Sequence, residues 1–222
     1  GNQYHPNFNL SQTEGDWIIL SNTFGNVVDS FKIVHKTKAD HSVGRSTNGA
    51  VDFKLFTTPT PNAANTGAIN FYTPTPFLSV QAGFYTAPQT ITITCANPSA
   101  TIRYTLDGST PTATSAQYSV PITITTTKVL RAIAFSTDQP SFTATNSYFI
   151  NVSHTIPVVS VCGSGVTTLI ANGTQITPVG GFELFEDNGL FIDEGEGDFN
   201  EHGNDSWAYD QRGFDFILRD QY

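Results

Sequence analysis

The strongest constraint on the fold is a two-residue alternation of apolar and polar side chains that recurs between residues 89 and 135. Successive side chains of a β-strand point to opposite faces, so such a segment has one apolar and one polar face. The alternation is clearest in TITITC (90–95), TIRYTLD (101–107) and ITITTTKVLRAIAF (122–135). With turn residues between the segments, it predicts a small antiparallel β-sandwich.

Composition agrees with an all-β chain and excludes some classes of partner. Hydrophobic residues make up 38% of the 222 residues, which is enough for a packed core, and only 13% are charged. The formal net charge of −9 disfavours nucleic acid and anionic lipid as partners, because both attract basic surfaces. No apolar run is long enough to span a membrane. The chain has no Met and no signal peptide at its start, so we expect a processed piece of a longer protein.

The alternation divides the chain into four stretches. Residues 1–67 contain the strand-like segments DWIILSN and VVDSFKIVHK around a Phe24-Gly25-Asn26 turn. Residues 68–76 form a Pro-rich linker, which we expect to be semi-rigid. The predicted sandwich follows over 77–153. Residues 154–222 alternate again in GGFELFED, GLFIDEG and RGFDFILRD, and GVTTLIANG is interpreted as a short helix or an irregular turn.

Residues 77–153 resemble the chitobiase/β-hexosaminidase C-terminal-like module, also called a fibronectin-III-associated domain. The resemblance rests on AGFYTAPQTITIT, ATIRYTLDGSTPTATSAQYSVPITI, LRAIAF and SYFIN, of which YTLDGSTPT is the most specific. It implies an immunoglobulin-like sandwich without catalytic residues of its own. Such modules accompany secreted enzymes and surface proteins, so the resemblance also implies an exported protein.

The flanking stretches resemble two further bacterial families. Residues 1–67 are similar to part of a lamin-tail domain, an immunoglobulin-like sandwich, through NFNL, VVDS, HSVGR, Gly49 and TPTPNAAN. The family's opening strands are missing before Gly1, which implies an open sheet edge that another chain, a loop or upstream residues would cover. Residues 154–222 resemble the start of a CotH-type kinase domain in its Bacteroidetes form, through HTIPVVSV, FELFEDNG and EHGNDSWAYDQRGFDFILRDQY. That resemblance implies Arg212 as a nucleotide-binding residue, with ATP and magnesium bound only if the domain is complete.

The YTLDGSTPT motif has a structural and a functional interpretation. Asp107-Gly108 supplies the positive φ of a tight hairpin, and Pro111 restricts the return strand. Asp107 is expected to accept hydrogen bonds from the backbone of Ser109 or Thr110, as in an Asx turn. In the alternative, the loop contacts a glycan, with Tyr104 and Tyr118 as ligand-contacting aromatic residues.

An acidic tract between Glu186 and Glu201 is interpreted either as a solvated loop or as a calcium site. Calcium prefers six to eight oxygen ligands from carboxylates and carbonyls, although the spacing here is not that of an EF-hand. The candidate ligands are Asp187, Asp193, Glu196 and Asp198.

The two cysteines do not establish a compartment. Cys95 alternates with Ile91 and Ile93, and Cys162 follows an apolar run, so both are predicted to be buried thiols. A single disulfide between them is the alternative.

These features predict an all-β fragment with tandem immunoglobulin-like sandwiches, followed by the β-rich start of a CotH-like domain. We expect a non-catalytic part of a secreted or cell-surface bacterial protein, acting in display, spacing, adhesion or assembly. The expected partners are a protein or further copies at open sheet edges, and glycan is an alternative. Two other functions stay open: the start of an ATP-dependent CotH-type protein kinase and a carbohydrate-binding accessory module.

Overall fold

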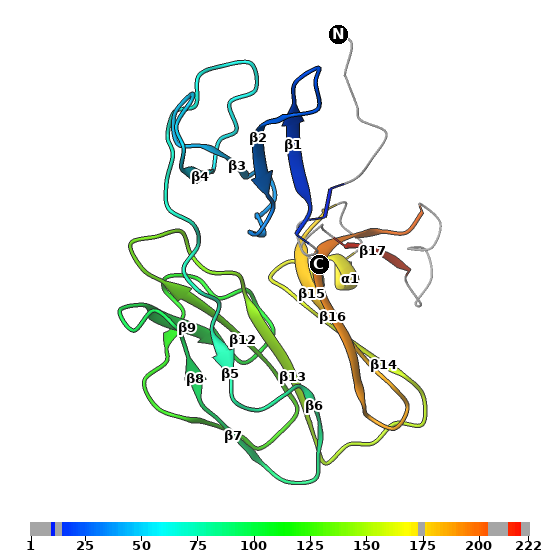
Figure 1. Ribbon diagram of the computed structural model, residues 1–222. Helices are drawn as coiled ribbons and strands as arrows, with labels where there is room; N and C mark the ends of the chain where they lie inside the picture. The colour runs from blue at the N-terminus through cyan, green and yellow to red at the C-terminus, as the bar shows by residue number, and fades with distance from the viewer. Residues whose placement is uncertain (1–9, 12–14, 173–175, 204–212, 219–222) are drawn as a thin grey trace.

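The computed structural model describes residues 10–11, 15–172, 176–203 and 213–218, and within them the chain is built almost wholly of β-strands (Figure 1). Three blocks follow one another along the chain: β1–β4, β5–β13, and β14–β17 with the short helix α1. The all-β prediction is confirmed. Within the described ranges, no helix is long and apolar enough to cross a bilayer.

The first block consists of two antiparallel hairpins, β1–β2 and β3–β4. The strands are β1 (Trp17–Ser21), β2 (Val27–Lys32), β3 (Ser42–Arg45) and β4 (Phe53–Phe56). The hairpins meet where the Phe31 and Phe53 rings stack at a centroid distance of 4.2 Å and Arg45 pairs with Asp29 at 2.6 Å. The sequence placed β1 and β2 correctly, and Gly25 has the positive φ of 82° that their turn requires.

The β1–β2 hairpin is apolar and largely uncovered by the rest of the described chain. Trp17, Ile19, Leu20 and Phe24 are each more than half exposed. A two-stranded hairpin alone is marginally stable, because it has no second layer against which to bury its apolar side chains. The hairpin thus exposes apolar side chains within the described residues, while the open sheet edge and the partner that would cover it stay predictions.

The second block forms the predicted sandwich. One layer is a five-stranded sheet in the order β10-β9-β12-β13-β6, in which β6 runs parallel to β13, and the other consists of the pairs β7–β11 and β5–β8. The strands are β5 (Phe77–Leu78), β6 (Gly83–Tyr85), β7 (Gln89–Ile91), β8 (Ile93–Thr94), β9 (Thr101–Thr105), β10 (Ala116–Gln117), β11 (Ile122–Ile124), β12 (Lys128–Phe135) and β13 (Ala144–Ile150). Between the layers lie the apolar residues of the alternation, including Ile91, Ile93, Ile122, Ile124 and Leu130.

Two segments that the sequence presented as continuous strands are each divided in two. Thr92 separates β7 from β8, which belong to different pairs, and residues 125–127 separate β11 from β12, which belong to different layers. Thr92 bonds instead to Ser79, which donates from its backbone to the Thr92 carbonyl and accepts from the Thr92 N–H through its hydroxyl. Strands that change partner in this way let a small sandwich curve around its core.

The third block is a four-stranded sheet in the order β14-β15-β16-β17. Its elements are β14 (Val158–Cys162), α1 (Val166–Asn172), β15 (Val179–Phe185), β16 (Phe191–Glu201) and β17 (Phe214–Leu218). Helix α1 packs on one face of this sheet, where Val166 and Leu169 bury themselves against Phe199. The segment GVTTLIANG is thus helical at its centre. The opposite face of the sheet turns toward the five-stranded sheet of the sandwich, which lies beside it in Figure 1.

The Pro-rich linker is held by hydrogen bonds to the blocks on either side. Ile69 exchanges two backbone hydrogen bonds with Leu55, and the Thr73 N–H donates to the carbonyl of Gln139. Thr73 is almost completely buried, and its hydroxyl lies 2.8 Å from that of Ser136. These bonds fix the linker more firmly than its proline content alone predicts.

Both cysteines are free thiols. Cys162 is buried, as expected, and burial raises the pKa of its thiol. The prediction that Cys95 is buried is wrong: it is only half-buried, because the chain leaves the sandwich core after Ile93, and its S–H donates to the carbonyl of Pro74.

Candidate functional site

The YTLDGSTPT loop forms the predicted Asx turn, in a wider hairpin than expected. Asp107 accepts hydrogen bonds from the backbone N–H and the hydroxyl of Ser109, at 3.0 and 2.6 Å, and these bonds lower the pKa of Asp107. Gly108 has a φ of 77°. However, β10 pairs with β9 through Ala116 and Tyr104, so a long loop that includes Pro111 separates the strands, rather than a two-residue turn.

This loop contacts the third block. The Thr110 N–H, which the sequence offered as a second donor to Asp107, donates to the hydroxyl of Ser164 at 2.8 Å. A Cβ atom on Gly108 would lie 3.0 Å from the Cβ of Cys162, so the backbone approaches the third block closely. The loop is therefore part of an interface within the chain.

Tyr104 and Tyr118 are both partly buried and pack against the sandwich core. Alternation along β9 turns Tyr104 inward, and the Tyr118 N–H donates to the carbonyl of Ile102 just beyond β10. A sugar-stacking aromatic ring needs an open face, so neither side chain is placed as a binding platform.

The four candidate calcium ligands do not converge. Asp187 lies in the exposed turn between β15 and β16, and the other three lie on β16. Because side chains alternate along a strand, Asp193 points to the opposite face of the sheet from Glu196 and Asp198. Among the residues that the structure describes, no group of three or more His, Cys, Asp or Glu side chains is placed to hold a metal ion. Arg212, the candidate nucleotide-binding residue, lies outside the described residues.

Glu196 instead forms an ion pair with Arg131 of the sandwich. Arg131 lies on β12 with its side chain almost completely buried, and its Nη2 is 3.0 Å from Glu196 Oε1. The same guanidinium donates to the hydroxyls of Thr110 and Thr145. A buried arginine needs this set of partners, because an unpaired charge in a protein interior is very costly. The network joins the second and third blocks.

A second buried carboxyl, Glu183 on β15, lies beside this ion pair. It is 1% exposed and accepts hydrogen bonds from the backbone N–H and the hydroxyl of Ser147 on β13. Burial raises the pKa of Glu183, although the Ser147 bonds oppose the shift. The Ser147 hydroxyl also lies 2.6 Å from that of Ser160 on β14. Three strands from two blocks thus share one polar cluster.

Aromatic packing closes one end of this interface. The rings of Phe84 and Phe149 stack at 4.4 Å, and the buried Phe185 meets both edge to face. Rings in this geometry are stabilised beyond their buried area. The face of β13 that carries Ser147 and Phe149 is therefore an internal surface of the chain.

The first block is fixed to the sandwich by Lys38. Its ammonium donates to the carbonyls of Pro140 and Ser141 at 2.8 and 2.9 Å and lies over the rings of Tyr72 and Phe142. Burial lowers the pKa of Lys38. The Lys38 N–H donates to the Tyr72 hydroxyl, which leaves the hydroxyl proton for His41 Nδ1 at 2.6 Å. Burial and the Lys38 charge lower the pKa of His41, in agreement with a neutral ring that accepts this bond.

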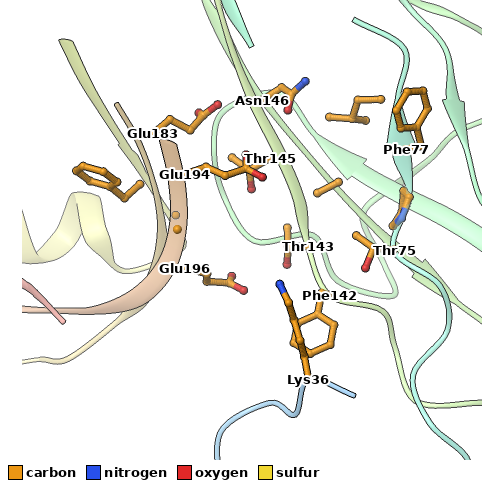
Figure 2. A pocket seen from close by; sticks show the side chains of 16 residues that line it. Lys36, Thr75, Phe77, Phe142, Thr143, Thr145, Asn146, Glu183, Glu194 and Glu196 are labelled. Atoms are coloured by element: carbon orange, nitrogen blue, oxygen red, sulfur yellow. The ribbon is translucent and has the colours of Figure 1, made fainter. Parts of the chain in front are cut away.

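A cavity of about 450 Å³ lies where the three blocks meet (Figure 2). The first block contributes Lys36, and the linker contributes Thr75 and Pro76. The sandwich contributes residues of β5 and β13, and the third block contributes Glu183, Glu194 and Glu196. Sequence reasoning singled out only Glu196 among these residues. The alternation in FIDEGEGDFN is the signal that could have grouped Glu194 with Glu196 on one face.

The comparison with known families agrees with the geometry of the second block. Residues 80–146 match the family model described as the chitobiase/beta-hexosaminidase C-terminal domain. The match covers most of the sandwich, including β6 to β12 and the start of β13, and no curated protein matches the chain. The second block is thus a β-sandwich whose sequence is similar to this family, which is compatible with a non-catalytic accessory role.

Proposed function

We propose that this chain is the non-catalytic β-structured part of a secreted or cell-surface bacterial multidomain protein, in which the sandwich acts as a rigid spacer. One observation carries the proposal: the outer face of the five-stranded sheet is buried against the third block, where Arg131 and Glu196 form an ion pair. A spacer must resist bending. A buried charge with several partners resists it, because separating the two blocks would leave each polar group without its hydrogen-bond partner.

The distribution of contacts along the chain supports the same role. Lys38 ties the first block to the sandwich, and the loop at Thr110 ties the sandwich to the third block. The polar groups at these junctions bond to one another, as expected of structural contacts. The acidic composition, the low charge content and the resemblances to exported modules support a location outside the cell.

The kinase alternative depends on the resemblance of residues 154–222 to a CotH-type domain, and it stays a prediction. Phosphoryl transfer requires magnesium ligands and groups that hold the phosphates. Two of the cavity-lining carboxylates in the described part of the third block are already engaged within the chain. Glu183 on β15 is bonded to Ser147, and Glu196 on β16 is paired with Arg131.

Small-angle X-ray scattering on the full chain tests the rigid spacer. We expect the wild-type curve to fit one arrangement of the three blocks, and the Ser147→Leu variant to fit an expanded ensemble, because the larger side chain cannot fit beside Glu183. Val120→Ser is the matched control, since Val120 is 67% exposed and its loss should leave the curve unchanged. A flexible wild-type ensemble would refute the spacer, and robust phosphoryl transfer from ATP by the same chain would refute a non-catalytic role.

A further inference from the structure

The cavity between the three blocks combines an exposed aromatic ring with polar groups on several sides. Figure 2 shows Glu194 and Glu196 on one side, Phe77 on the other, Thr143 and Thr145 between them, and Lys36 near Phe142 and Glu196. Its volume of about 450 Å³ lies in the range of small-ligand sites, which is roughly 300–1,000 Å³.

Phe77 is exposed because of its position on β5. The next residue, Leu78, is 8% exposed and belongs to the sandwich core, so alternation turns Phe77 outward, where it is 67% exposed beside the cavity. An aromatic ring with an open face offers a flat apolar surface. The C–H face of a sugar ring is a ligand surface of matching shape and polarity.

The opposite wall supplies hydrogen-bond acceptors. Glu194 and Glu196 occupy alternate positions on β16 and therefore project from the same face of the sheet. Arg131 bonds to Oε1 of Glu196, and a carboxylate can accept several hydrogen bonds, so acceptor capacity remains for ligand hydroxyl groups. Glu194 is exposed on β16, so its carboxylate is accessible to a ligand, and its partial burial beside the cavity raises its pKa.

The charges around the cavity favour a neutral ligand over a free cation. Three glutamates line the cavity, but Arg131 already pairs with Glu196, and Lys36 lines the same space with its own positive charge. A cationic ligand would have to compete with both side chains. A polyhydroxylated ligand has no such competitor, because it donates to carboxylates and accepts from an ammonium group.

We propose that this cavity is a carbohydrate-binding site, in which Phe77 stacks on a pyranose ring and Glu194 and Glu196 accept its hydroxyl hydrogens. The site needs all three blocks in place, since each contributes to its lining. It differs from the Tyr104 and Tyr118 region of the sandwich, where the rings face the core.

A glycan array of pyranose mono- and disaccharides, probed with the full chain, tests the proposal, with isothermal titration calorimetry on the strongest hit. We expect Phe77→Ala to weaken binding about tenfold or more, because a stacked aromatic contact contributes on that scale. Glu194→Gln should weaken binding about tenfold by replacing a charged acceptor. Phe24→Ala is the matched control: Phe24 is 87% exposed on the first hairpin, and its removal should leave affinity unchanged.

Three results would overturn the proposal. One is no binding to any pyranose on the array, and another is unchanged affinity in Phe77→Ala and Glu194→Gln variants that retain the wild-type circular dichroism spectrum. The third is binding of a polyamine such as spermidine in place of sugars. Each result leaves the rigid-spacer proposal standing, because scattering measures the arrangement of the blocks without a ligand.

Discussion

Removing the Glu196 carboxylate tests the buried ion pair that joins the sandwich to the third block. Glu196→Ala removes the carboxylate that pairs with the Arg131 guanidinium. The Arg131 charge then stays buried without that partner, because the Arg131 side chain is only 1% exposed. Breaking a buried pair from one side costs roughly 3–5 kcal/mol of unfolding free energy. The Glu196 side chain is 21% exposed, so solvent can partly replace its carboxylate. We therefore expect the free energy of unfolding to fall by about 3 kcal/mol, at the lower end of that range. For a chain of this size, that loss lowers the melting temperature by roughly 6–12 °C.

Removing Arg131 in place of Glu196 should lower the free energy of unfolding by a smaller amount. Arg131→Met removes the buried charge itself and keeps an apolar side chain on β12, while the remaining carboxylate stands at the edge of the cavity. We expect a loss of about 2 kcal/mol, which includes the lost bonds to Thr110 and Thr145. The double variant should be less destabilised than the sum of the single variants, by roughly 1–3 kcal/mol, because the two groups contact one another.

Urea unfolding followed by far-ultraviolet circular dichroism gives these free energies, and hydrogen exchange shows whether β12 and β16 lose protection together. Asp187→Ala is the control, since Asp187 is an exposed carboxylate in the same acidic tract and should change stability by less than about 0.5 kcal/mol. A cost below about 1 kcal/mol for Glu196→Ala, or strictly additive single variants, would refute the reasoning.

Three further predictions concern the same interface. Burial raises the pKa of Glu183, so above about pH 4.5 the folded chain retains a proton that the unfolded chain has released. The stability that this retained proton gives the fold is complete below that pH and is lost as pH rises through the folded pKa. Glu183→Gln should therefore abolish the loss of stability that wild type shows in urea unfolding as pH rises above about 4.5, and a pH profile parallel to wild type would contradict this assignment. Gly108→Ala should cost about 1 kcal/mol more than Gly25→Ala in the same assay, since both glycines have positive φ but only Gly108 lies against Cys162; equal costs would exclude the close approach. Iodoacetamide should label Cys95 faster than Cys162 in the folded chain, because Cys162 is buried with a raised thiol pKa; equal rates, by mass spectrometry, would contradict that burial.

The sequence predicted those parts of the fold that depend on neighbouring residues. Alternation identified the strand regions of the sandwich, and the Asp107-Gly108 pair identified an Asx turn with positive φ. It did not locate the break at Thr92, because Thr92 continues the alternation and leaves the strand only through its bonds to Ser79. The strand break at Thr92 depends on Ser79, which is distant in sequence. The local pattern of residues therefore does not predict the break.

The polar face of β13 illustrates a second limit. Alternation presents Thr145 and Ser147 as solvent-facing residues, yet Ser147 is 1% exposed because the third block covers it. A polar face that meets water and one that meets a polar sheet have the same sequence pattern. Arg131 was the available signal: a charged residue within the apolar run VLRAIAF requires a partner, and the sequence does not say which carboxylate supplies it.

The acidic tract shows how strand geometry decides between roles that composition leaves open. Composition grouped Asp193 with Glu196, whereas the two-residue period places them on opposite faces of the sheet. The face that turns toward the sandwich carries Glu183, Glu194 and Glu196, and each has a different environment: hydrogen bonds from Ser147, the open cavity, and the Arg131 charge. All three carboxylates thus line the cavity, and two of them, Glu183 and Glu196, also bond to the sandwich across the interface. The same interface that holds the blocks rigid would therefore also hold the proposed sugar contacts in position.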